Sequence, residues 1–304
     1  MIFMKNNPLL SIIINCFNSD KYLRETIDSL IAQTYENWEI IFWDNQSIDS
    51  SADIAKSYSD SRIKYFLAPE HTSLGEGRNH ALSKVSGDIV SFLDADDYYL
   101  PERLRNIVNS FNDNDKVDFI YTNGFRLNQN TKIKTPFYDI KQKSGNLFQS
   151  WLKNYNVMIP SVAFKSELLL EMHELVDVRF SMIEEYDFFL RMIKDKNVKY
   201  LDDKSCIWRC HSESLTWKEN KNWSVELEMF LIKLQDIYPN DKLELSTLQK
   251  KIAISKYIYG LTNNKNERNI LIKYVFKSYK VFFLYMLSFF GFRLTRLVVN
   301  RIIF

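Results

Sequence analysis

The stretch Asp88-Ile89-Val90-Ser91-Phe92-Leu93-Asp94-Ala95-Asp96-Asp97 decides the fold class of this chain and points to its chemistry. Its mostly apolar, β-branched first part predicts a buried strand. The strand ends in three carboxylates, and like charges this close repel one another unless a cation or hydrogen-bond donors neutralise them. We interpret Asp96 and its neighbours as a divalent-metal site of hard oxygen ligands, suited to Mg²⁺ or Mn²⁺. A solvated turn, followed by a helix that begins near Pro101, remains the alternative.

The segments before this strand alternate between strand and helix periodicity. Apolar runs predict strands at residues 9–16, 38–43, 63–67 and 89–93, and amphipathic runs predict helices at about 20–32, 51–58 and 77–84. A strand–helix–strand rhythm predicts right-handed βαβ units and an α/β domain with a mostly parallel sheet flanked by helices.

Polar residues fall where ligands bind in such sheets, beyond the carboxyl ends of the strands. They form three groups, at residues 15–18, 44–49 and 94–97. Glycine-rich phosphate loops do not account for nucleotide binding here, because the Gly-Lys-Ser/Thr pattern is missing and His80 replaces the third glycine after Gly75-Glu76-Gly77. A bound nucleotide would therefore need a metal on the acidic group to neutralise its diphosphate.

Composition narrows the class of protein. A chain of 304 residues can bury a large core without disulfides, and its three scattered cysteines favour a reducing compartment. Cys206, Cys210 and His211 lack a fourth ligand with finger-like spacing, so we do not expect zinc. The formal net charge of +2 is too small to favour a nucleic acid partner.

A series of motifs, in order, resembles the family-2 glycosyltransferases over about residues 9–215. The motifs are Leu10-Ser11-Ile12-Ile13-Ile14 ending near Asn18, Glu39-Ile40-Ile41-Phe42-Trp43-Asp44, Ser47-Ile48-Asp49, Gly77-Arg78-Asn79, Gly87-Asp88 leading to Asp94-Ala95-Asp96-Asp97, Glu184-Glu185-Tyr186-Asp187 with Leu190-Arg191, and Trp208-Arg209-Cys210-His211 with Ser214. The resemblance implies the GT-A fold, a Rossmann-like, mostly parallel sheet flanked by helices.

The resemblance also implies roles for individual residues. Those implied to bind the nucleotide sugar are Asn15, Cys16, Phe17, Asn18, Asp44, Arg78, Asp94 and Ala95. Asp44 would accept a hydrogen bond from the base, most often uracil, and Asp94 would contact the ribose. Arg78 would lie against the base or the diphosphate as a fixed cation. Asp96 would hold the metal, Mn²⁺ or Mg²⁺, and His211 would be a second metal or phosphate ligand.

The catalytic base implied by the resemblance is Glu185. The family usually has Asp at this position, so Glu184 and Asp187 remain alternatives. These acids also begin an apolar helical run, and acids favour a helix N-terminus without any catalytic role. A second departure lies after the second strand, where Asp44-Asn45-Gln46-Ser47 replaces the usual Asp-Asp-Gly-Ser.

The function implied is metal-dependent, inverting transfer of a sugar from a nucleotide donor, expected to be UDP, to a hydroxyl of a saccharide or glycolipid in surface polysaccharide or lipopolysaccharide synthesis. Residues 1–112 would bind the donor, and residues 113–222 would bind the acceptor and carry the base, with Trp151 and Tyr155 as candidate sugar-stacking surfaces. Two other functions remain open. One is a non-catalytic scaffold that binds nucleotide sugar or a membrane partner. The other is a nucleotidyltransferase, although its Gly- and Lys-rich signature after the first strand is missing.

Residues 223–304 are predicted to form a helical extension. From Leu271 onward, apolar and aromatic residues are punctuated by Lys and Arg, with no acid. The uncharged run 281–292 is too short to span a bilayer. The pattern favours helices lying in the membrane interface, with cations toward anionic head groups, on the inner face of the cell membrane. A helix that packs on the catalytic domain or on a second copy of the chain is the alternative; the sequence does not predict the oligomeric state.

Overall fold

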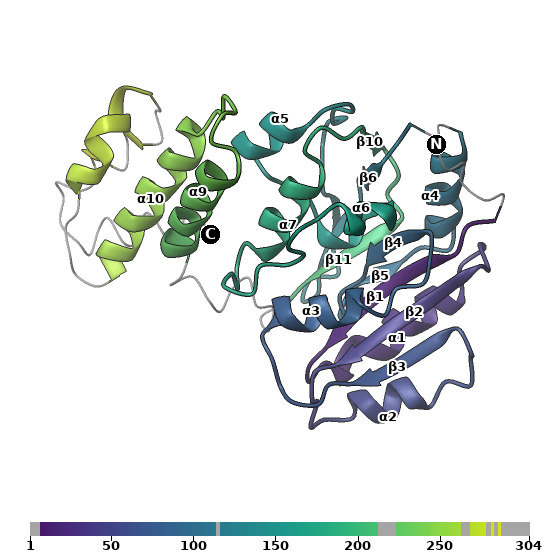
Figure 1. Cartoon of the computed structure of the whole chain (residues 1–304). Helices are drawn as coiled ribbons and strands as arrows, with labels where there is room; N and C mark the ends of the chain where they lie inside the picture. Colours follow the sequence, from purple (N-terminus) through teal and green to yellow (C-terminus); the bar gives the residue numbers. More distant parts are fainter. Residues whose placement is uncertain are drawn as a thin grey trace. The chain divides into compact units, whose positions relative to one another are not determined.

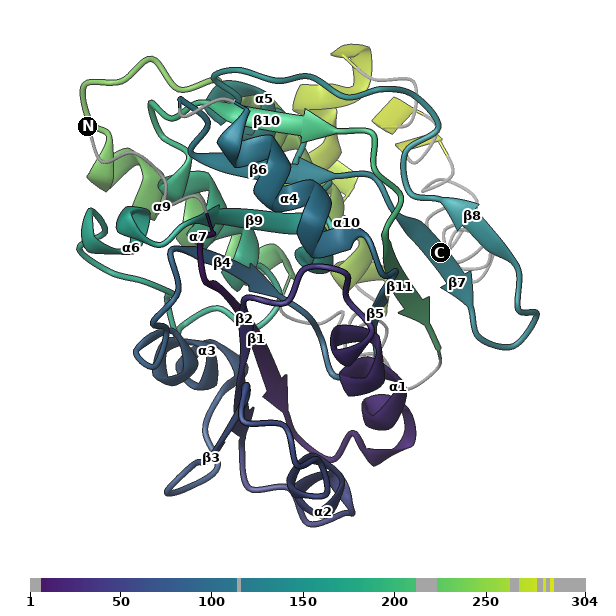
Figure 2. The ribbon, with the colours of Figure 1, turned by 90° about the vertical axis from the view of Figure 1, so that its right-hand side faces the viewer.

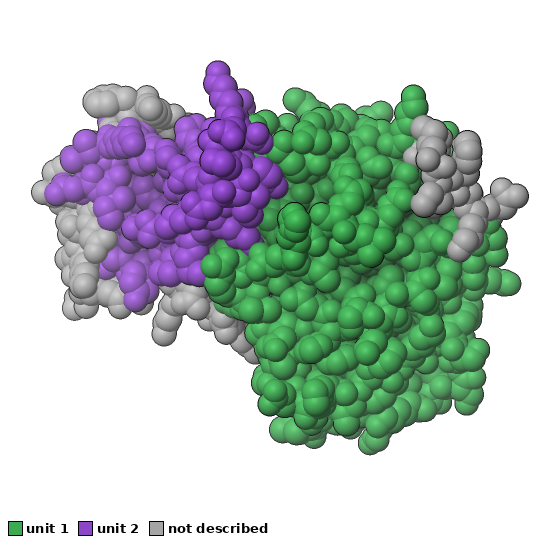
Figure 3. All heavy atoms as spheres, viewed as in Figure 1, with its two compact units in different colours: residues 1–151, 155–214 green, residues 152–154, 215–304 purple. Residues whose placement is uncertain are grey.

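The computed structural model describes residues 7–113, 116–211, 223–262, 268–277, 281–282 and 285–286. The chain forms two compact units, shown in different colours in Figure 3: one of residues 1–151 and 155–214, the other of residues 152–154 and 215–304. Residues on both sides of the predicted division at position 112 belong to the first unit, so a division into donor and acceptor halves concerns parts of one unit and stays a prediction.

Strands and helices alternate along the chain up to residue 92, and less regularly after it (Figure 1). The first half contains β1 (Leu10–Cys16), α1 (Asp20–Ile31), β2 (Trp38–Asp44), α2 (Ser51–Lys56), β3 (Ile63–Leu67), α3 (Leu74–Leu82), β4 (Ile89–Phe92), β5 (Tyr98–Tyr99), α4 (Arg103–Asn112), β6 (Phe119–Thr122), β7 (Phe125–Asn128) and β8 (Lys134–Pro136). These are followed by α5 (Phe148–Lys153), η1 (Ile159–Ser161), β9 (Val162–Lys165), α6 (Glu167–Leu170), α7 (Glu184–Met192), β10 (Val198–Leu201), β11 (Cys206–Cys210), α9 (Trp223–Ile237), α10 (Ser246–Thr262) and η2 (Arg268–Lys277).

A seven-stranded sheet in the order β10-β6-β9-β4-β1-β2-β3 forms the centre of the first unit. β1, β2, β3 and β4 run parallel, whereas β9 is antiparallel to β4 and to β6. α1 and α3 lie on opposite faces of the β1–β2 part of the sheet (Figure 2). This agrees with right-handed crossovers that run in opposite directions along the sheet, from β1 to β2 through α1 and from β3 to β4 through α3. The predicted α/β fold with a mostly parallel sheet is confirmed.

Helices on both faces explain why the central strands are continuous apolar runs rather than alternating ones. All of β2 is buried, including Glu39, whose carboxylate accepts hydrogen bonds from the Ser11 hydroxyl at 2.5 Å and from the Ser86 hydroxyl, and pairs with Lys64. Side-chain partners of this kind let an acid occupy a central strand.

One expectation about local structure is wrong. The helix expected to begin at Gly77 begins at Leu74, because the Ser73 side chain accepts a hydrogen bond from the Glu76 backbone N–H at 3.2 Å and caps the helix there. The alternative for the residues after β4 holds in part: the Asp97 N–H donates to the Asp94 carbonyl at 3.0 Å in a turn, and helix α4 begins at Arg103, soon after Pro101. The turn is not simply solvated, because Asp97 is fully buried.

A second, four-stranded sheet has the order β5-β11-β7-β8. β5 follows the acidic residues in the chain, and β11 pairs with it antiparallel, with Ile207 opposite Tyr98. This pairing brings the end of β11 beside the acidic loop that follows β4.

The second unit is helical where the structure describes it. Buried Tyr257, Leu271 and Val281 form a small apolar core against which Ile254, Tyr274 and Tyr285 pack. Within the described residues, no helix combines the length and apolar character that a membrane crossing requires. Arg293, Arg296 and Arg301, on which the predicted membrane surface depends, lie outside the described residues, so that prediction stays untested.

Candidate active site

The loops after β1 and β2 meet at the carboxyl edge of the sheet. Asn18 adopts a positive φ of 50°, which Asn tolerates better than most residues. Its backbone N–H donates to the Ser47 hydroxyl at 3.1 Å, and its side-chain oxygen accepts from the Ile48 N–H at 2.9 Å. The polar groups predicted at residues 15–18 and 44–49 therefore lie together.

Asp44, the predicted base-binding residue, is fully buried. The Tyr65 hydroxyl donates to one carboxylate oxygen at 2.5 Å, and the Ser47 N–H donates to the other at 2.8 Å. The residues that replace the usual Asp-Gly bind the next loop instead: Asn45 bonds to the backbone and hydroxyl of Thr72, and Gln46 to the Ala68 carbonyl. Recognition of uracil by Asp44 stays a prediction.

The other residues of the first loop differ in exposure. Cys16 is buried, and burial raises the pKa of its thiol to about 11, so it stays a neutral thiol. Phe17 is 46% exposed, and its ring centroid lies 4.2 Å from that of His71. The Asn15 amide nitrogen is buried without a hydrogen-bond partner among the described residues. A side chain at position 77 would stand 3.2 Å from this nitrogen, so Gly77 allows the close approach.

The acidic loop after β4 has a different partner for each acid. Asp94 lies 3.8 Å from the Arg78 guanidinium, and Asp96 lies 2.8 Å from Nε2 of His211. Asp97 accepts a hydrogen bond from the Arg209 backbone N–H at 2.8 Å. Ala95 is buried, and its carbonyl accepts from the Thr26 hydroxyl at 2.9 Å. Arg78, Asp96 and His211 are all predicted site residues and lie far apart in the sequence. The structure brings them together around one loop.

The three candidate bases have distinct surroundings. Glu184 is buried and bonds to Arg78 at 2.7 Å. Asp187 is fully buried, and one of its oxygens accepts from Arg191 at 2.7 and 3.0 Å. Glu185 is partly exposed, and no ion pair holds it within the described residues. Both rival acids are thus engaged in ion pairs, which favours Glu185 as the proton acceptor.

Burial and neighbouring acids raise the pKa of the carboxyl groups of Glu185, Asp94 and Asp97. Removal from water raises the pKa of Glu185 to about 8; Arg78 opposes the rise, and Glu184 and Asp94 add to it. The same cause raises the pKa of Asp94 to about 6, again opposed by Arg78 and increased by Asp96 and Glu184. Although 41% of the Asp94 side chain remains accessible, packed protein around the carboxylate still limits its hydration. Acids with pKa values shifted in this way cluster at functional sites.

The residues at Asp96 fit a divalent cation. Its carboxylate and the His211 imidazole meet at 2.8 Å, and Nδ1 of His211 is buried with no hydrogen-bond partner in the described part of the chain. One carboxylate and one imidazole are few ligands for a closed protein cage. They suit a metal that completes its shell with phosphate oxygens and water, as Mg²⁺ and Mn²⁺ do at phosphate-handling sites.

A separate acidic group does not coincide with this pair. Oxygens of Glu174, Asp177 and Asp187 lie within 4.8 Å of one another. Arg179 binds both oxygens of Asp177, at 2.8 and 2.6 Å, and Arg191 binds Asp187. Because guanidinium groups already offset this negative charge, we assign the group a structural role.

The expected sugar-stacking surface is only partly available. Trp151 is 5% exposed and packs edge-on against Phe119 and Tyr121, so it is a core residue and its assignment as a sugar platform is wrong. Tyr155 is partly exposed and stacks on Tyr186, the residue after Glu185, with ring centroids 4.5 Å apart. Tyr155 therefore stays a candidate for the acceptor side.

Comparison with protein families identifies the chain. Residues 11–167, more than half of it, match the model described as "Glycosyl transferase family 2". The chain belongs to glycosyltransferase family 2. The predicted family and enzyme class are therefore confirmed.

Relatives within this family differ in how much of their length the chain spans. An uncharacterized glycosyltransferase of Rickettsia typhi is 32% identical over 216 residues, covering 67% of this chain and 65% of the relative. The match thus spans just under two thirds of that protein. The Escherichia coli enzyme WfgD, named a UDP-Glc:α-D-GlcNAc-diphosphoundecaprenol β-1,3-glucosyltransferase, is 27% identical over 260 residues, covering 84% of this chain and 98% of WfgD.

Solved structures show the same fold. Staphylococcus aureus TarS 1–349 in complex with UDP-GlcNAc is similar with a TM-score of 0.62 at 17% identity, covering 88% of this chain and 80% of TarS. The mannosyltransferase PcManGT of Pyrobaculum calidifontis, in complex with GDP-Man and Mn²⁺, is similar with a TM-score of 0.54 at 17% identity. The match covers 84% of this chain and 71% of PcManGT. At this identity the likeness shows the fold alone, and the predicted GT-A fold is confirmed.

Proposed function

We propose that this family-2 glycosyltransferase moves a sugar from a nucleoside diphosphate donor, expected to be UDP-linked, to a hydroxyl group of a saccharide or lipid-linked acceptor, with inversion at the anomeric carbon. One observation carries the proposal. Arg78 of α3 lies between Asp94, which follows β4, and Glu184 at the start of α7, and Glu185 stands next to this ion pair. A fixed cation and an acid without an ion pair in the described part of the chain therefore meet at the edge of the sheet where ligands of α/β folds bind.

Glu185 is the proposed general base. As the new bond forms between the acceptor oxygen and the anomeric carbon, the hydroxyl proton passes to the Glu185 carboxylate. The bond to the diphosphate breaks, and the electron pair leaves with it. A pKa of about 8 suits this role, because a base works best with a pKa near the operating pH. Arg78 offsets negative charge that develops on the leaving group.

The proposed cofactor is Mn²⁺ or Mg²⁺, held by Asp96 and His211. Such a cation, when bound, neutralises the diphosphate. The donor set of one carboxylate and one imidazole supports this assignment, and a structural neighbour, PcManGT, was solved with Mn²⁺. Asp94, close to Arg78, is left to contact the donor sugar or ribose.

The donor and acceptor classes take their support from relatives. WfgD is named for a UDP-glucose donor and a diphosphoundecaprenol-linked acceptor, and TarS was solved with UDP-GlcNAc. By analogy we propose a UDP-sugar donor and a lipid-linked acceptor in surface polysaccharide or lipopolysaccharide synthesis.

We further propose that residues 223–304 bind the inner face of the cell membrane, where such an acceptor would lie. Apolar Ile272 and Phe282 are about half exposed, at 50% and 48%, in a stretch that carries many cations and no acid. A chain shortened after Arg268 should lose flotation with anionic lipid vesicles, whereas the full chain floats. Equal flotation of both would contradict membrane binding by this segment.

A screen of nucleotide-sugar donors tests the main proposal, because slow donor hydrolysis needs no acceptor. We expect hydrolysis of at least one UDP-sugar with Mn²⁺ and its loss with a chelator. Donor binding without hydrolysis or transfer under any condition would instead favour a non-catalytic scaffold.

A further inference from the structure

The main chain of the acidic loop is held by side chains at three successive carbonyls. The Thr26 hydroxyl of α1 binds the carbonyls of Ala95 and Asp97, at 2.9 and 2.7 Å. The Arg209 side chain binds the carbonyl between them, that of Asp96, at 2.6 Å. Since the carboxylates of this loop repel one another, such anchoring opposes the tendency of the loop to open.

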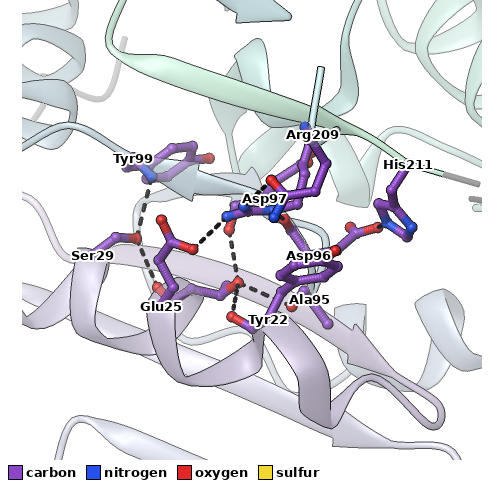
Figure 4. A network of polar contacts seen from close by, with 11 residues as sticks. Tyr22, Glu25, Ser29, Ala95, Asp96, Asp97, Tyr99, Arg209 and His211 are labelled. Carbon is purple, nitrogen blue, oxygen red and sulfur yellow. Dashed lines mark hydrogen bonds and ion pairs between the residues drawn. The ribbon is translucent and has the colours of Figure 1, made fainter. Parts of the chain in front are cut away.

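Arg209 is the residue on which these contacts converge (Figure 4). Its guanidinium group binds the Asp96 carbonyl, the Gln129 side chain at 2.9 Å and the Glu25 carboxylate at 2.7 Å, and its backbone N–H binds the Asp97 carboxylate at 2.8 Å. The Arg209 side chain is 3% exposed. One buried side chain therefore connects β11, the residue after β7, helix α1 and the acidic loop.

The Tyr22 ring of α1 extends this arrangement to the second predicted metal ligand. The Arg209 guanidinium carbon lies 4.4 Å from the centroid of the Tyr22 ring, and the His211 ring lies 5.2 Å from it. Arg209 lies near the end of β11 and His211 directly follows that strand, and both side chains lie against the Tyr22 ring. The same strand end thus presents both the loop's anchor and the imidazole that meets Asp96.

We propose that Arg209 is a positioning residue: it fixes the loop so that Asp96 and His211 meet at the distance a shared divalent cation needs. This inference rests on the proposed function, because it concerns the same metal. A pre-ordered ligand pair binds more tightly, since less conformational entropy is lost when the ligand arrives. Arginine suits the position because its planar group donates in several fixed directions at once, which a lysine ammonium on a flexible stem does not reproduce.

The test compares Arg209→Lys with a matched change at another buried arginine. Arg103 is fully buried and binds the Thr122 hydroxyl at 3.1 Å and the Pro160 carbonyl at 3.2 Å, and neither of these partners belongs to the acidic loop. Calorimetry measures UDP affinity of each full-length variant with Mn²⁺ and with a chelator. We expect Arg209→Lys to weaken UDP binding in the presence of Mn²⁺ by about tenfold or more. The UDP affinity measured with the chelator should stay unchanged. Arg103→Lys should lower the melting temperature and keep the Mn²⁺-dependent affinity within about twofold.

A milder variant tests the same inference in case Arg209→Lys fails to fold. Glu25 is 53% exposed, so Glu25→Gln should fold, and loss of its ion pair with Arg209 should weaken Mn²⁺-dependent binding by about threefold. Wild-type affinity in Arg209→Lys, or an equal loss in Arg103→Lys, would overturn the inference while leaving the proposed function intact. A wild-type protein whose UDP binding ignores Mn²⁺ would instead overturn the metal assignment itself.

Discussion

Arg78 and Glu184 form a 2.7 Å ion pair across 106 positions of the chain, and each side chain is 6% exposed. This pair gives the neighbouring acids different surroundings. It engages Glu184 with a cation, leaves Glu185 next to it with a raised pKa, and keeps a second guanidinium nitrogen 3.8 Å from Asp94. The segments predicted to bind the donor and the acceptor are thereby joined at Arg78.

Replacing Glu185 with Gln should abolish proton acceptance without removing the shape of the side chain. We expect turnover to fall by about a hundredfold or more, with UDP affinity within about twofold of wild type. Steady-state kinetics and calorimetry measure the two effects. Glu171→Gln, which changes an exposed acid bonded to Lys196, is the control and should keep full turnover. Normal turnover in Glu185→Gln would transfer the base role to another acid.

The pH dependence of kcat/KM follows from the Glu185 pKa of about 8. Below that pH the carboxyl group is protonated and cannot accept the acceptor proton. The ratio kcat/KM should therefore rise with pH and level off above about pH 8. At pH 7 it should be about tenfold below the plateau. A profile that stays flat from pH 6 to about pH 9 would contradict this assignment.

Stability should respond to pH in the opposite direction. The pKa of Glu185 is about 8 in the folded protein against an ordinary value of 4.5, so the folded state keeps a proton that the unfolded chain releases between these pH values. This contribution to stability is fully present below about pH 4.5 and is lost as pH rises through 8. Glu185→Gln lacks this titration. The melting temperature of the variant, relative to that of the wild type, should therefore increase by a few degrees as pH rises. A difference that is constant with pH would argue against the raised pKa.

Removing Arg78 should leave the Glu184 carboxylate buried without its cation. Arg78→Gln is expected to destabilise the protein by about 3 kcal/mol, measured by denaturant unfolding. The double variant Arg78→Gln/Glu184→Gln should recover a large part of that loss, because it removes the stranded charge. Additive losses in the double variant would show that the two residues are not coupled.

Asp96→Ala tests the metal ligand directly. We expect the variant to bind UDP equally with Mn²⁺ and with a chelator, whereas the wild type binds more tightly with Mn²⁺. Calorimetry under both conditions measures the difference. Glu174→Gln belongs to the other acidic group and should retain the metal dependence. A variant at Asp96 that keeps its Mn²⁺-dependent increment would place the cation elsewhere.

Sequence patterns predicted the framework well, because strand and helix periods are local properties. The strands at 10–16, 38–44, 63–67 and 89–92 lie within a residue or two of the expected runs, and the polar groups lie at the expected carboxyl edge. Helix α3 began earlier than predicted because a serine cap, not apolar periodicity, sets its start.

Side-chain roles that depend on distant partners did not follow from those patterns. Trp151 and Tyr155 look alike in sequence, yet one is core and the other borders the site. Arg209 was visible in the Arg-x-His motif, but its contacts with Asp96 and Glu25 were not, since they join residues 113 and 184 positions apart. No local signal marked the Tyr65 hydroxyl as the partner of Asp44.

The sequence by itself determined the sheet, the edge of the sheet at which ligands are expected, the family and the set of acids that the site contains. The tertiary structure decided which acid is paired and which stays available, and which residues hold the acidic loop. The reason is physical. Burial of apolar runs depends on neighbours along the chain, whereas the charge state and orientation of a carboxylate depend on the groups that packing brings around it.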